Sequence, residues 1–302
     1  MSSFRLRTAE ADDAPAVASL VAALDVALLG STDYTIADLV DEWRELAPAN
    51  RWVALDGDRM VGYATVEETP SHVQTDGYVH PEHFGRGVGA FLVNELEQAA
   101  GERGARRVQT ATLVEDRRAH ALLAGHGYDE IRRFWHMRIA LDREPAPPSW
   151  PEGLTATGFD PVDAEAFHTA LESAFEDHWQ HEPRPFDEWR RRNLHGDDFT
   201  PELWTVVRDG REIVAGTICV PERMGAGWIG RLVTARAWRR RGVGEALLHD
   251  AFGKFWRRGT RTVGLGVDAE SDTGAQRLYE RVGMHVHWSA VVFEKVLDAR
   301  AA

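Results

Sequence analysis

Residues 237–248 read AWRRRGVGEALL: three arginines run into Gly-Val-Gly, and an amphipathic segment follows at once. The preceding residues WIGRLVT (228–234) are apolar and β-branched enough to predict a strand, and we expect a helix from Gly242 to about Arg258. The first N–H groups of a helix have no partner within it, and the helix dipole adds partial positive charge there. Strand, glycine loop and helix together therefore predict an anion site. The alternative is a helix cap flanked by solvated arginines.

The residue types of this loop suit a phosphate. Gly242 and Gly244 lack a Cβ atom, so a pyrophosphate can approach the backbone closely, and Arg239, Arg240 and Arg241 add positive charge. The loop has no Walker lysine, which argues against a P-loop nucleotidase. A dinucleotide-binding domain would place its glycine motif after the first strand of the fold, whereas this motif follows the fourth predicted strand.

The glycine loop and its surroundings occur twice in the chain. FGRGVGAFLVNELEQAAGERGARRVQTAT (84–112) matches RRRGVGEALLHDAFGKFWRRGTRTVGLGV (239–267), and AHALLAGHGYDEI (119–131) matches AQRLYERVGMHVH (275–287) at nearly the same separation. We interpret this as two copies of one domain, residues 1–141 and 153–302. Residues 142–152 are rich in proline and are expected to form a stiff linker.

Each copy is predicted to run strand, one or two helices, three strands, helix, strand, helix, two strands. TVGLGV (262–267) is a short strand of the buried type, and TGAQRLYERVG (273–283) is a helix that stops at Gly283. The expected fold class is α/β, with a mixed (α+β) sheet covered by helices.

Composition excludes several function classes. The net charge of −13 argues against a nucleic-acid-binding protein and suits a neutral or cationic small-molecule substrate better. No apolar run is long enough for a membrane span and no secretory signal is visible, so we expect a cytoplasmic protein with no membrane partner. The single cysteine, Cys219, lies in the apolar stretch IVAGTICV and is expected to be a buried structural thiol.

The paired motifs point to a known family. RRRGVG resembles the Arg/Gln-x-x-Gly-x-Gly/Ala motif of the GNAT superfamily of acyl-CoA N-acyltransferases, and AQRLYERVGM resembles its closing helix. The tandem order is similar to that of actinobacterial mycothiol synthase-like proteins. The resemblance implies two GNAT folds, acetyl-CoA as co-substrate, transfer of an acetyl group to a primary amine of a small molecule, and either a monomer with an internal pseudo-dimer or a homodimer.

The resemblance also implies a set of cofactor-binding residues. The pantetheine arm would lie along the fourth strand of the second copy, the pyrophosphate at the glycine loop, and further contacts would come from the closing region. In the second copy these residues are Leu232, Val233, Thr234, Arg239, Arg240, Arg241, Gly242, Val243, Gly244, Glu245, Asp272 and Arg277. In the first copy the loop residues are Gly85, Arg86, Gly87, Val88 and Gly89.

The resemblance further implies that Tyr279 protonates the leaving thiolate, a role that suits a phenol with a pKa near 10. The resemblance supplies no matching residue for the general base. Mycothiol synthase-like proteins use a glutamate on the fourth strand, where this chain has Trp228. Glu176, Asp177 and His178 are candidates, and the alternative is that they lie on a solvated amphipathic helix. Asp268 is either an acceptor-site residue or a strand cap.

The two copies differ at the positions that carry chemistry. The first copy has Phe84 at the first motif position and Leu123 where the second has Tyr279, while Tyr78 and Tyr128 do not match that position. We therefore expect the second copy to be catalytic and the first to be structural or a vestigial CoA site. The alternative function is a non-catalytic CoA-binding sensor.

Overall fold

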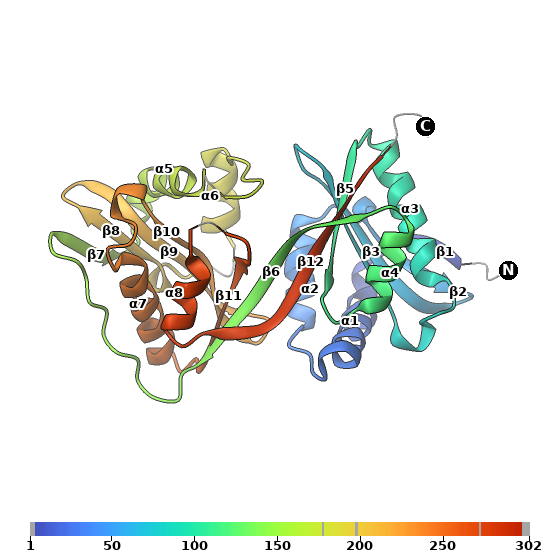
Figure 1. Cartoon of the computed structure of the whole chain (residues 1–302), viewed down its shortest axis with the longest axis horizontal. Coiled ribbons are helices and arrows are strands. Elements are labelled where there is room, and N and C mark those ends of the chain that lie inside the picture. Colours follow the sequence, from blue (N-terminus) through green and yellow to red (C-terminus); the bar gives the residue numbers. More distant parts are fainter. Residues whose placement is uncertain (1–3, 177, 197–198, 272, 298–302) are drawn as a thin grey trace. The chain divides into compact units, whose positions relative to one another are not determined.

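The computed structural model describes residues 4–176, 178–196, 199–271 and 273–297, which form two compact units (Figure 1). The N-terminal unit comprises Met1–Phe134 together with Trp288–Ala302, and the C-terminal unit comprises Trp135–His287. Each unit has a mixed sheet with helices packed on it, so the predicted fold class is confirmed.

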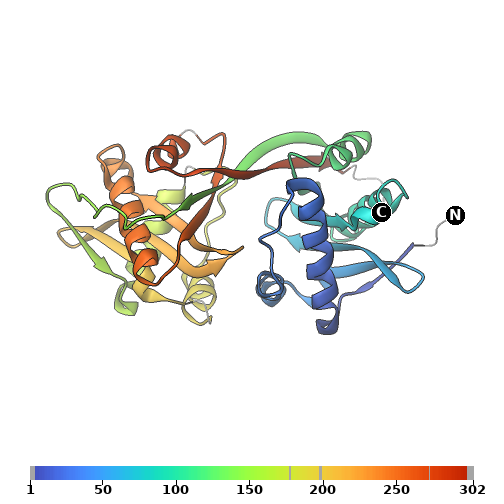
Figure 2. The same ribbon diagram turned by 90° about the horizontal axis from the view of Figure 1, so that it is seen from below.

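The N-terminal unit has strands in the order β1-β2-β3-β4-β5-β12, and only the β4–β5 pair is parallel. Helix α1 lies across its strands (Figure 2), and helices α3 and α4 contribute to a separate apolar cluster. Its elements are β1 (Phe4–Thr8), α1 (Ala14–Leu29), α2 (Ile36–Glu45), β2 (Arg51–Asp56), β3 (Arg59–Glu68), β4 (Val73–Val79), α3 (Val88–Glu102), β5 (Arg107–Leu113) and α4 (Arg117–Gly125).

The C-terminal unit repeats this plan with strands in the order β6-β11-β10-β9-β8-β7. The strands predicted at 228–234 and 262–267 are confirmed as β10 and β11, and the chain leaves the last helix through Gly283 at φ +94°. Two long strands, β6 (Asp129–Ala140) and β12 (His285–Val296), each have residues in both units. The other elements of the C-terminal unit are β7 (Leu154–Gly158), α5 (Ala164–Phe175), α6 (Phe186–Leu194), β8 (Thr205–Asp209), β9 (Glu212–Arg223), β10 (Ala226–Thr234), α7 (Val243–Arg257), β11 (Thr262–Asp268) and α8 (Ala275–Arg281).

Each unit takes one strand from the sequence of the other copy. Strand β12 ends the chain but pairs antiparallel with β5 of the N-terminal unit, and its Val291 and Phe293 are buried in that unit's core. Conversely, the end of β6 lies beside β11, where the Leu141 amide donates a hydrogen bond to the Arg261 carbonyl (2.7 Å). The compact units therefore do not coincide with residues 1–141 and 153–302, and residues 142–152 lie within the C-terminal unit. Residues 1–141 and 153–302 stay a prediction for where the two copies of the sequence repeat begin and end.

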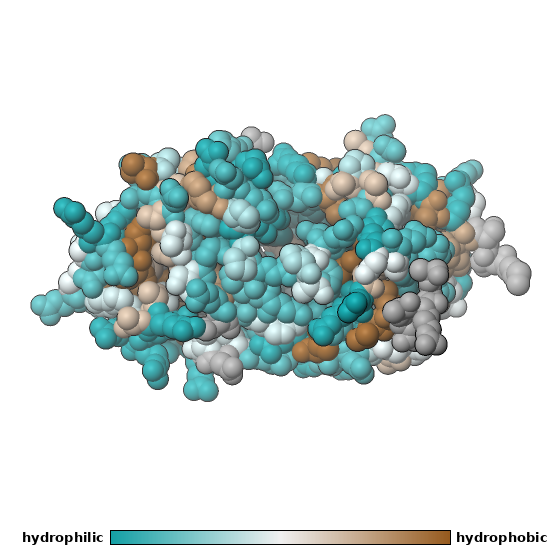
Figure 3. Space-filling model, turned by 90° about the horizontal axis from the view of Figure 1, so that it is seen from above, coloured by the Kyte–Doolittle hydropathy of each residue, from teal (hydrophilic) through white to brown (hydrophobic). Residues whose placement is uncertain are grey.

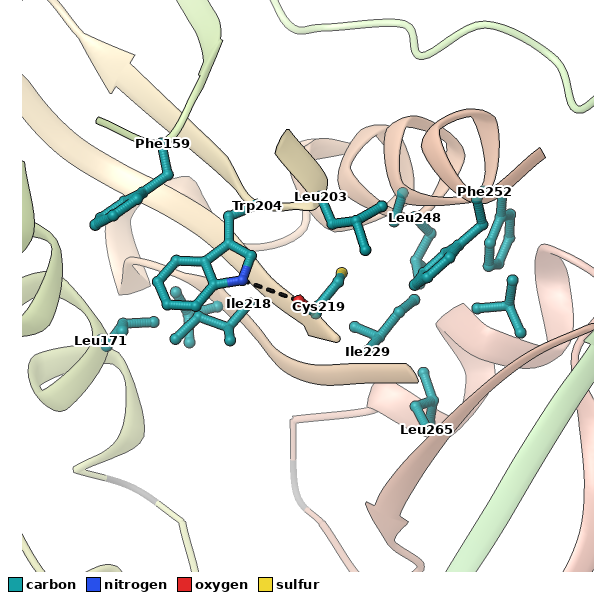
Figure 4. Close-up of a cluster of buried hydrophobic side chains, with 14 of the residues drawn as sticks. Phe159, Leu171, Leu203, Trp204, Ile218, Cys219, Ile229, Leu248, Phe252 and Leu265 are labelled. Atoms are coloured by element: carbon teal, nitrogen blue, oxygen red, sulfur yellow. Dashed lines mark hydrogen bonds between the residues drawn. The ribbon is translucent and has the colours of Figure 1, made fainter. Parts of the chain in front are cut away.

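The C-terminal core is built on aromatic side chains (Figure 4). Trp204 is 1% exposed, contacts Phe159 at a centroid distance of 4.8 Å, and donates from Nε1 to the Cys219 carbonyl at 2.9 Å. Cys219 is itself fully buried, and burial raises the pKa of its thiol to about 12. The expectation of a structural thiol is therefore confirmed.

Both lysines of the chain are held in partly buried ion pairs. Lys254 Nζ lies 3.0 Å from the Asp250 carboxylate and donates to Thr205 Oγ1 and the Trp204 carbonyl. Lys295, on β12, pairs with Glu97 at 2.8 Å. Each lysine thus ties a helix carboxylate to its unit's sheet region.

Hydrophilic residues cover most of the face in Figure 3, where hydrophobic residues form only small, separate patches. None of the helices in the described part of the chain is both long and apolar enough to cross a lipid bilayer.

The strand exchange predicts where a mutation at the end of the chain acts. Phe293→Ala should lower the free energy of unfolding of the N-terminal unit by about 3–5 kcal/mol, because the phenyl ring is only 5% exposed in that unit's core. Amide hydrogen exchange should accelerate in α3 and β5 and stay unchanged in α7. Val296→Ala is the control, since Val296 is 67% exposed. Faster exchange in α7 with α3 unaffected would contradict the assignment of β12.

Candidate functional site

The site begins where two parallel strands part. β10 pairs with β11 only at Gly227–Val263 and Trp228–Gly264, and its register with β9 shifts around Gly230. Beyond this point β10 keeps β9 as a neighbour on one side, so alternate main-chain N–H and C=O groups on the other side are left without a strand partner. Leu232, Val233 and Thr234, predicted to hold the pantetheine arm, lie on this stretch.

The glycine loop follows directly and has an unusual backbone. Gly242 is the N-cap of α7 at φ +85°, and Arg240 adopts φ +60°, which is uncommon for a side chain with a Cβ atom. In the other copy Gly85 (φ +72°) and Gly87 (φ +90°) have the same left-handed pattern before α3. A turn with left-handed residues can point successive N–H groups to one side, which makes a concavity for an anion.

The packing of α8 also requires a glycine at position 244. A Cβ atom there would lie 2.8 Å from Leu278 Cδ2, and at Gly89 one would lie 3.0 Å from Leu122 Cδ2. Glycine at this position therefore also makes room for α8, and the expectation that Gly244 makes room for a pyrophosphate stays a prediction. Val243 and Val88 are 1% exposed and anchor their helices, so only their main chains can face a ligand.

The loop arginines differ in what they contact. The Arg239 guanidinium donates to the Thr234 carbonyl (3.2 Å) and to the Ala174 carbonyl (3.1 Å), so it ties β10 to the end of α5. Arg240 and Arg241 are exposed, and Arg241 lies 5.0 Å from the centroid of the Trp238 ring. The positive charge that remains open to an anion thus comes from Arg240 and Arg241.

The remaining predicted cofactor residues lie near the first turns of α7 and on α8. Glu245 forms an ion pair with Arg281 at 3.3 Å, which links these two helices. Arg277 is exposed on α8, and Arg86 is exposed in the loop of the N-terminal unit. Asp272 lies outside the described residues.

Tyr279 follows Leu278, whose side chain packs against Gly244, so α8 brings it close to the glycine loop. Its ring is 8% exposed in the C-terminal core, and burial raises the pKa of its phenol to about 12. Its Oη forms no hydrogen bond with any residue that the structure describes. A protonated phenol with a free donor is suited to giving up a proton to a leaving group.

The end of α5 and the residues that follow it form the side of the site next to β10. The His178 ring lies 4.2 Å from that of Phe175, and its pKa is lowered by burial and then by Arg239, His181 and Arg231, against the effect of Asp268. Two of the predicted candidates, His178 and Asp268, therefore lie near each other, and Arg239 of the glycine loop lies near His178. Glu176 is exposed at the C-cap of α5, and Asp177 lies outside the described residues.

Two residues on this side of the site were missed from the sequence. Glu172 accepts hydrogen bonds from His181 Nε2 (3.1 Å) and the Arg184 amide (3.2 Å), which fixes the segment after α5. Arg231 lies on β10, 5.1 Å from the Phe175 ring centroid. Neither has a local sequence signal, because their partners are nine to more than fifty residues away.

The geometry agrees with comparisons to known proteins. The model of the acetyltransferase (GNAT) family matches residues 21–128 and again residues 164–284. The chain belongs to this family. It is similar to a GCN5-related N-acetyltransferase from Sphaerobacter thermophilus, with 36% identity, a TM-score of 0.87 and coverage of 97% of this chain and 95% of that one.

Two further relatives bear on the arrangement. A mycothiol acetyltransferase of Streptomyces avermitilis is 28% identical over 246 residues, which are 78% of this chain and 77% of that protein. A tandem GNAT protein from the clavulanic acid biosynthesis pathway has the same fold, with 16% identity, a TM-score of 0.73 and coverage of 97% and 98% of the two chains. The prediction of an N-acetyltransferase with two GNAT folds in tandem is confirmed, and the family generally uses acetyl-CoA as co-substrate.

The N-terminal GNAT fold keeps the scaffold and changes the side chains. β4 and β5 pair in parallel at residues 73–75 and 108–110 and then part, but β4 shows no register shift against β3. Leu123 is buried where the other copy has Tyr279. Tyr128 is buried, and burial followed by Glu97 raises the pKa of its phenol. Tyr78 lies on β4 rather than on α4.

The packing role of Gly244 can be separated from a phosphate role. Gly244→Ala should displace α8 and lower kcat, because the new methyl group meets Leu278 Cδ2. Without that clash alanine would stabilise α7 by about 1 kcal/mol. Adding Leu278→Val, which shortens the side chain, should restore both kcat and thermal stability. If Gly244→Ala instead weakens CoA binding in calorimetry and Leu278→Val does not restore it, the phosphate role is correct.

Proposed function

We propose that the C-terminal GNAT fold transfers the acetyl group of acetyl-CoA to a primary amine of a small molecule, by direct attack of the amine and with Tyr279 as general acid. The proposal rests on one observation: β10 leaves β11 after Trp228, the chain then leads through Thr234 to the glycine loop, and Tyr279 lies on the helix packed against that loop. The stretch Leu232–Gly242 would hold the co-substrate, which supplies an acetyl thioester.

Main-chain groups and side chains then have separate tasks. The N–H groups that β10 turns away from β9 can polarise a carbonyl, which stabilises the negative charge that develops on its oxygen. As the bond between the acetyl carbon and sulfur breaks, Tyr279 donates its proton to the departing thiolate. A pKa of about 12 keeps Tyr279 protonated throughout the range in which amines are acetylated.

His178 is the better of the candidate bases. An amine can attack only when neutral, so a base must accept one proton from it. Because the pKa of His178 lies below its usual 6.5, the imidazole is neutral at pH 7 and able to accept that proton. Glu176 is exposed to solvent, where a carboxylate is a weak base.

Tyr279→Phe tests both the acid and the assignment of the active unit. It keeps the ring in the core and removes the proton, so kcat should fall by roughly 10²–10⁴ with CoA affinity unchanged. Thiol release with acetyl-CoA and a panel of amines measures the rate, normalised to folded protein. Tyr128→Phe is the matched control in the other unit.

Two outcomes would overturn this assignment. Near-wild-type turnover in Tyr279→Phe would move the chemistry to another residue or to the N-terminal unit. Tight CoA binding with no thiol release for any amine would favour the alternative of a CoA-binding sensor. Leu123→Tyr in the Tyr279→Phe background should stay inactive.

The pH profile tests His178. Protonation removes its ability to accept a proton, so kcat/KM should fall as the pH drops below the pKa of His178, which lies under 6.5. His178→Gln should lower kcat/KM at pH 8 by roughly 10²–10⁴ and flatten the acid limb. The ratio of wild type to variant across pH 5–9 cancels the titration of the amine itself. An unchanged acid limb in His178→Gln rules the residue out as base.

A further inference from the structure

Arg231 is the charged residue on the parted stretch of β10, residues 231–234. It follows the register shift at Gly230 and lies at a distance of 5.1 Å from the Phe175 ring centroid. Among the described residues its guanidinium donates only to the neighbouring Gly230 carbonyl (3.2 Å) and forms no ion pair. The residue is exposed, so a solute can reach it.

The neighbourhood of Arg231 is positive although the whole chain is acidic. Partial desolvation and then the guanidinium groups of Arg184 and Arg192 lower the pKa of Arg231, and among the side chains that act on it Glu172 opposes them. Glu172 already accepts hydrogen bonds from His181 and from the Arg184 main chain. Arg184 also forms an ion pair with Glu188 at 3.0 Å, so the charge that can attract an anion here is mainly that of Arg231 itself.

The N-terminal unit shows that the fold does not require an arginine here. Asp76 stands at the same sequence distance before the N-cap Gly87 as Arg231 does before Gly242. Asp76 lies opposite Thr65 on β3 and accepts a hydrogen bond from it at 3.4 Å. The two copies therefore carry opposite charges at one strand position. Such a difference is expected where a side chain determines which ligand binds.

We infer that Arg231 binds an anionic oxygen group, a carboxylate or a phosphate, on the acceptor amine itself. The inference rests on the proposed function, because it places the acceptor beside Phe175 and His178. A guanidinium offers paired donors that match the oxygens of such a group. Asp268, which acts on His178 from the end of β11, is placed to attract the ammonium of the same molecule before it loses its proton. An acceptor with both an amine and an anionic group replaces the neutral or cationic acceptor expected from net charge.

Matched acceptor pairs test this with the full chain. We would compare amino acids with their carboxamides, O-phosphoethanolamine with ethanolamine, and glucosamine 6-phosphate with glucosamine, by thiol release from acetyl-CoA. The anionic member of at least one pair should have a kcat/KM about 10–100-fold higher, through KM. The pair that shows it distinguishes a carboxylate from a phosphate.

Variants at Arg231 then assign the preference. Arg231→Gln should collapse the ratio within that pair to near one, Arg231→Lys should keep part of it, and Arg257→Gln, at the exposed end of α7, should keep all of it. CoA affinity and thermal stability of Arg231→Gln should stay at wild-type values. Preference for the neutral members, or an equal loss for both members in Arg231→Gln, overturns the inference while leaving the proposed function intact. No thiol release with any amine overturns the proposed function instead.

Discussion

The parting of β10 from β11 is the constraint on which the C-terminal site depends. Two parallel pairs hold the strands together and then the ladder stops, so the main chain of β10 keeps donors and acceptors that a third strand would otherwise occupy. The same strand runs on through the left-handed loop to the first turn of α7. One continuous stretch can therefore bind an extended ligand at one end and its anionic part at the other.

Everything else in the site is placed by packing against that stretch. Gly244 lets α8 approach and so positions Tyr279, while Arg239 holds the end of α5, and with it His178, against β10. The N-terminal unit repeats the parting strands and the loop but has leucine for tyrosine and aspartate for arginine. The N-terminal unit thus keeps the scaffold and differs at the side chains that we propose to act in the C-terminal unit.

The sequence predicted the fold, both glycine loops and the helix carrying Tyr279, because strands, helices and glycine turns have local patterns. It did not reveal the exchanged strands, because the local patterns of β6 and β12 predict strands but do not indicate which sheet each one joins. Nor did it reveal that Gly244 serves packing or that Arg239 contacts carbonyls. Those facts depend on Leu278 and Ala174, which lie far away in the chain. Nor does any local pattern place Arg231 beside Phe175, the contact from which the anionic-acceptor hypothesis follows.

The buried ion pairs of the two lysines have a chemical consequence. A protein that works among acetyl thioesters exposes its own amines to them, and lysine ammonium groups are the usual targets. Here the basic surface is made almost wholly of arginine, whose guanidinium stays protonated and does not react. Lys254 and Lys295 are partly buried, and each ammonium lies within ion-pair distance of a carboxylate, that of Asp250 or Glu97. The enzyme therefore offers few reactive side-chain amines to acetyl thioesters.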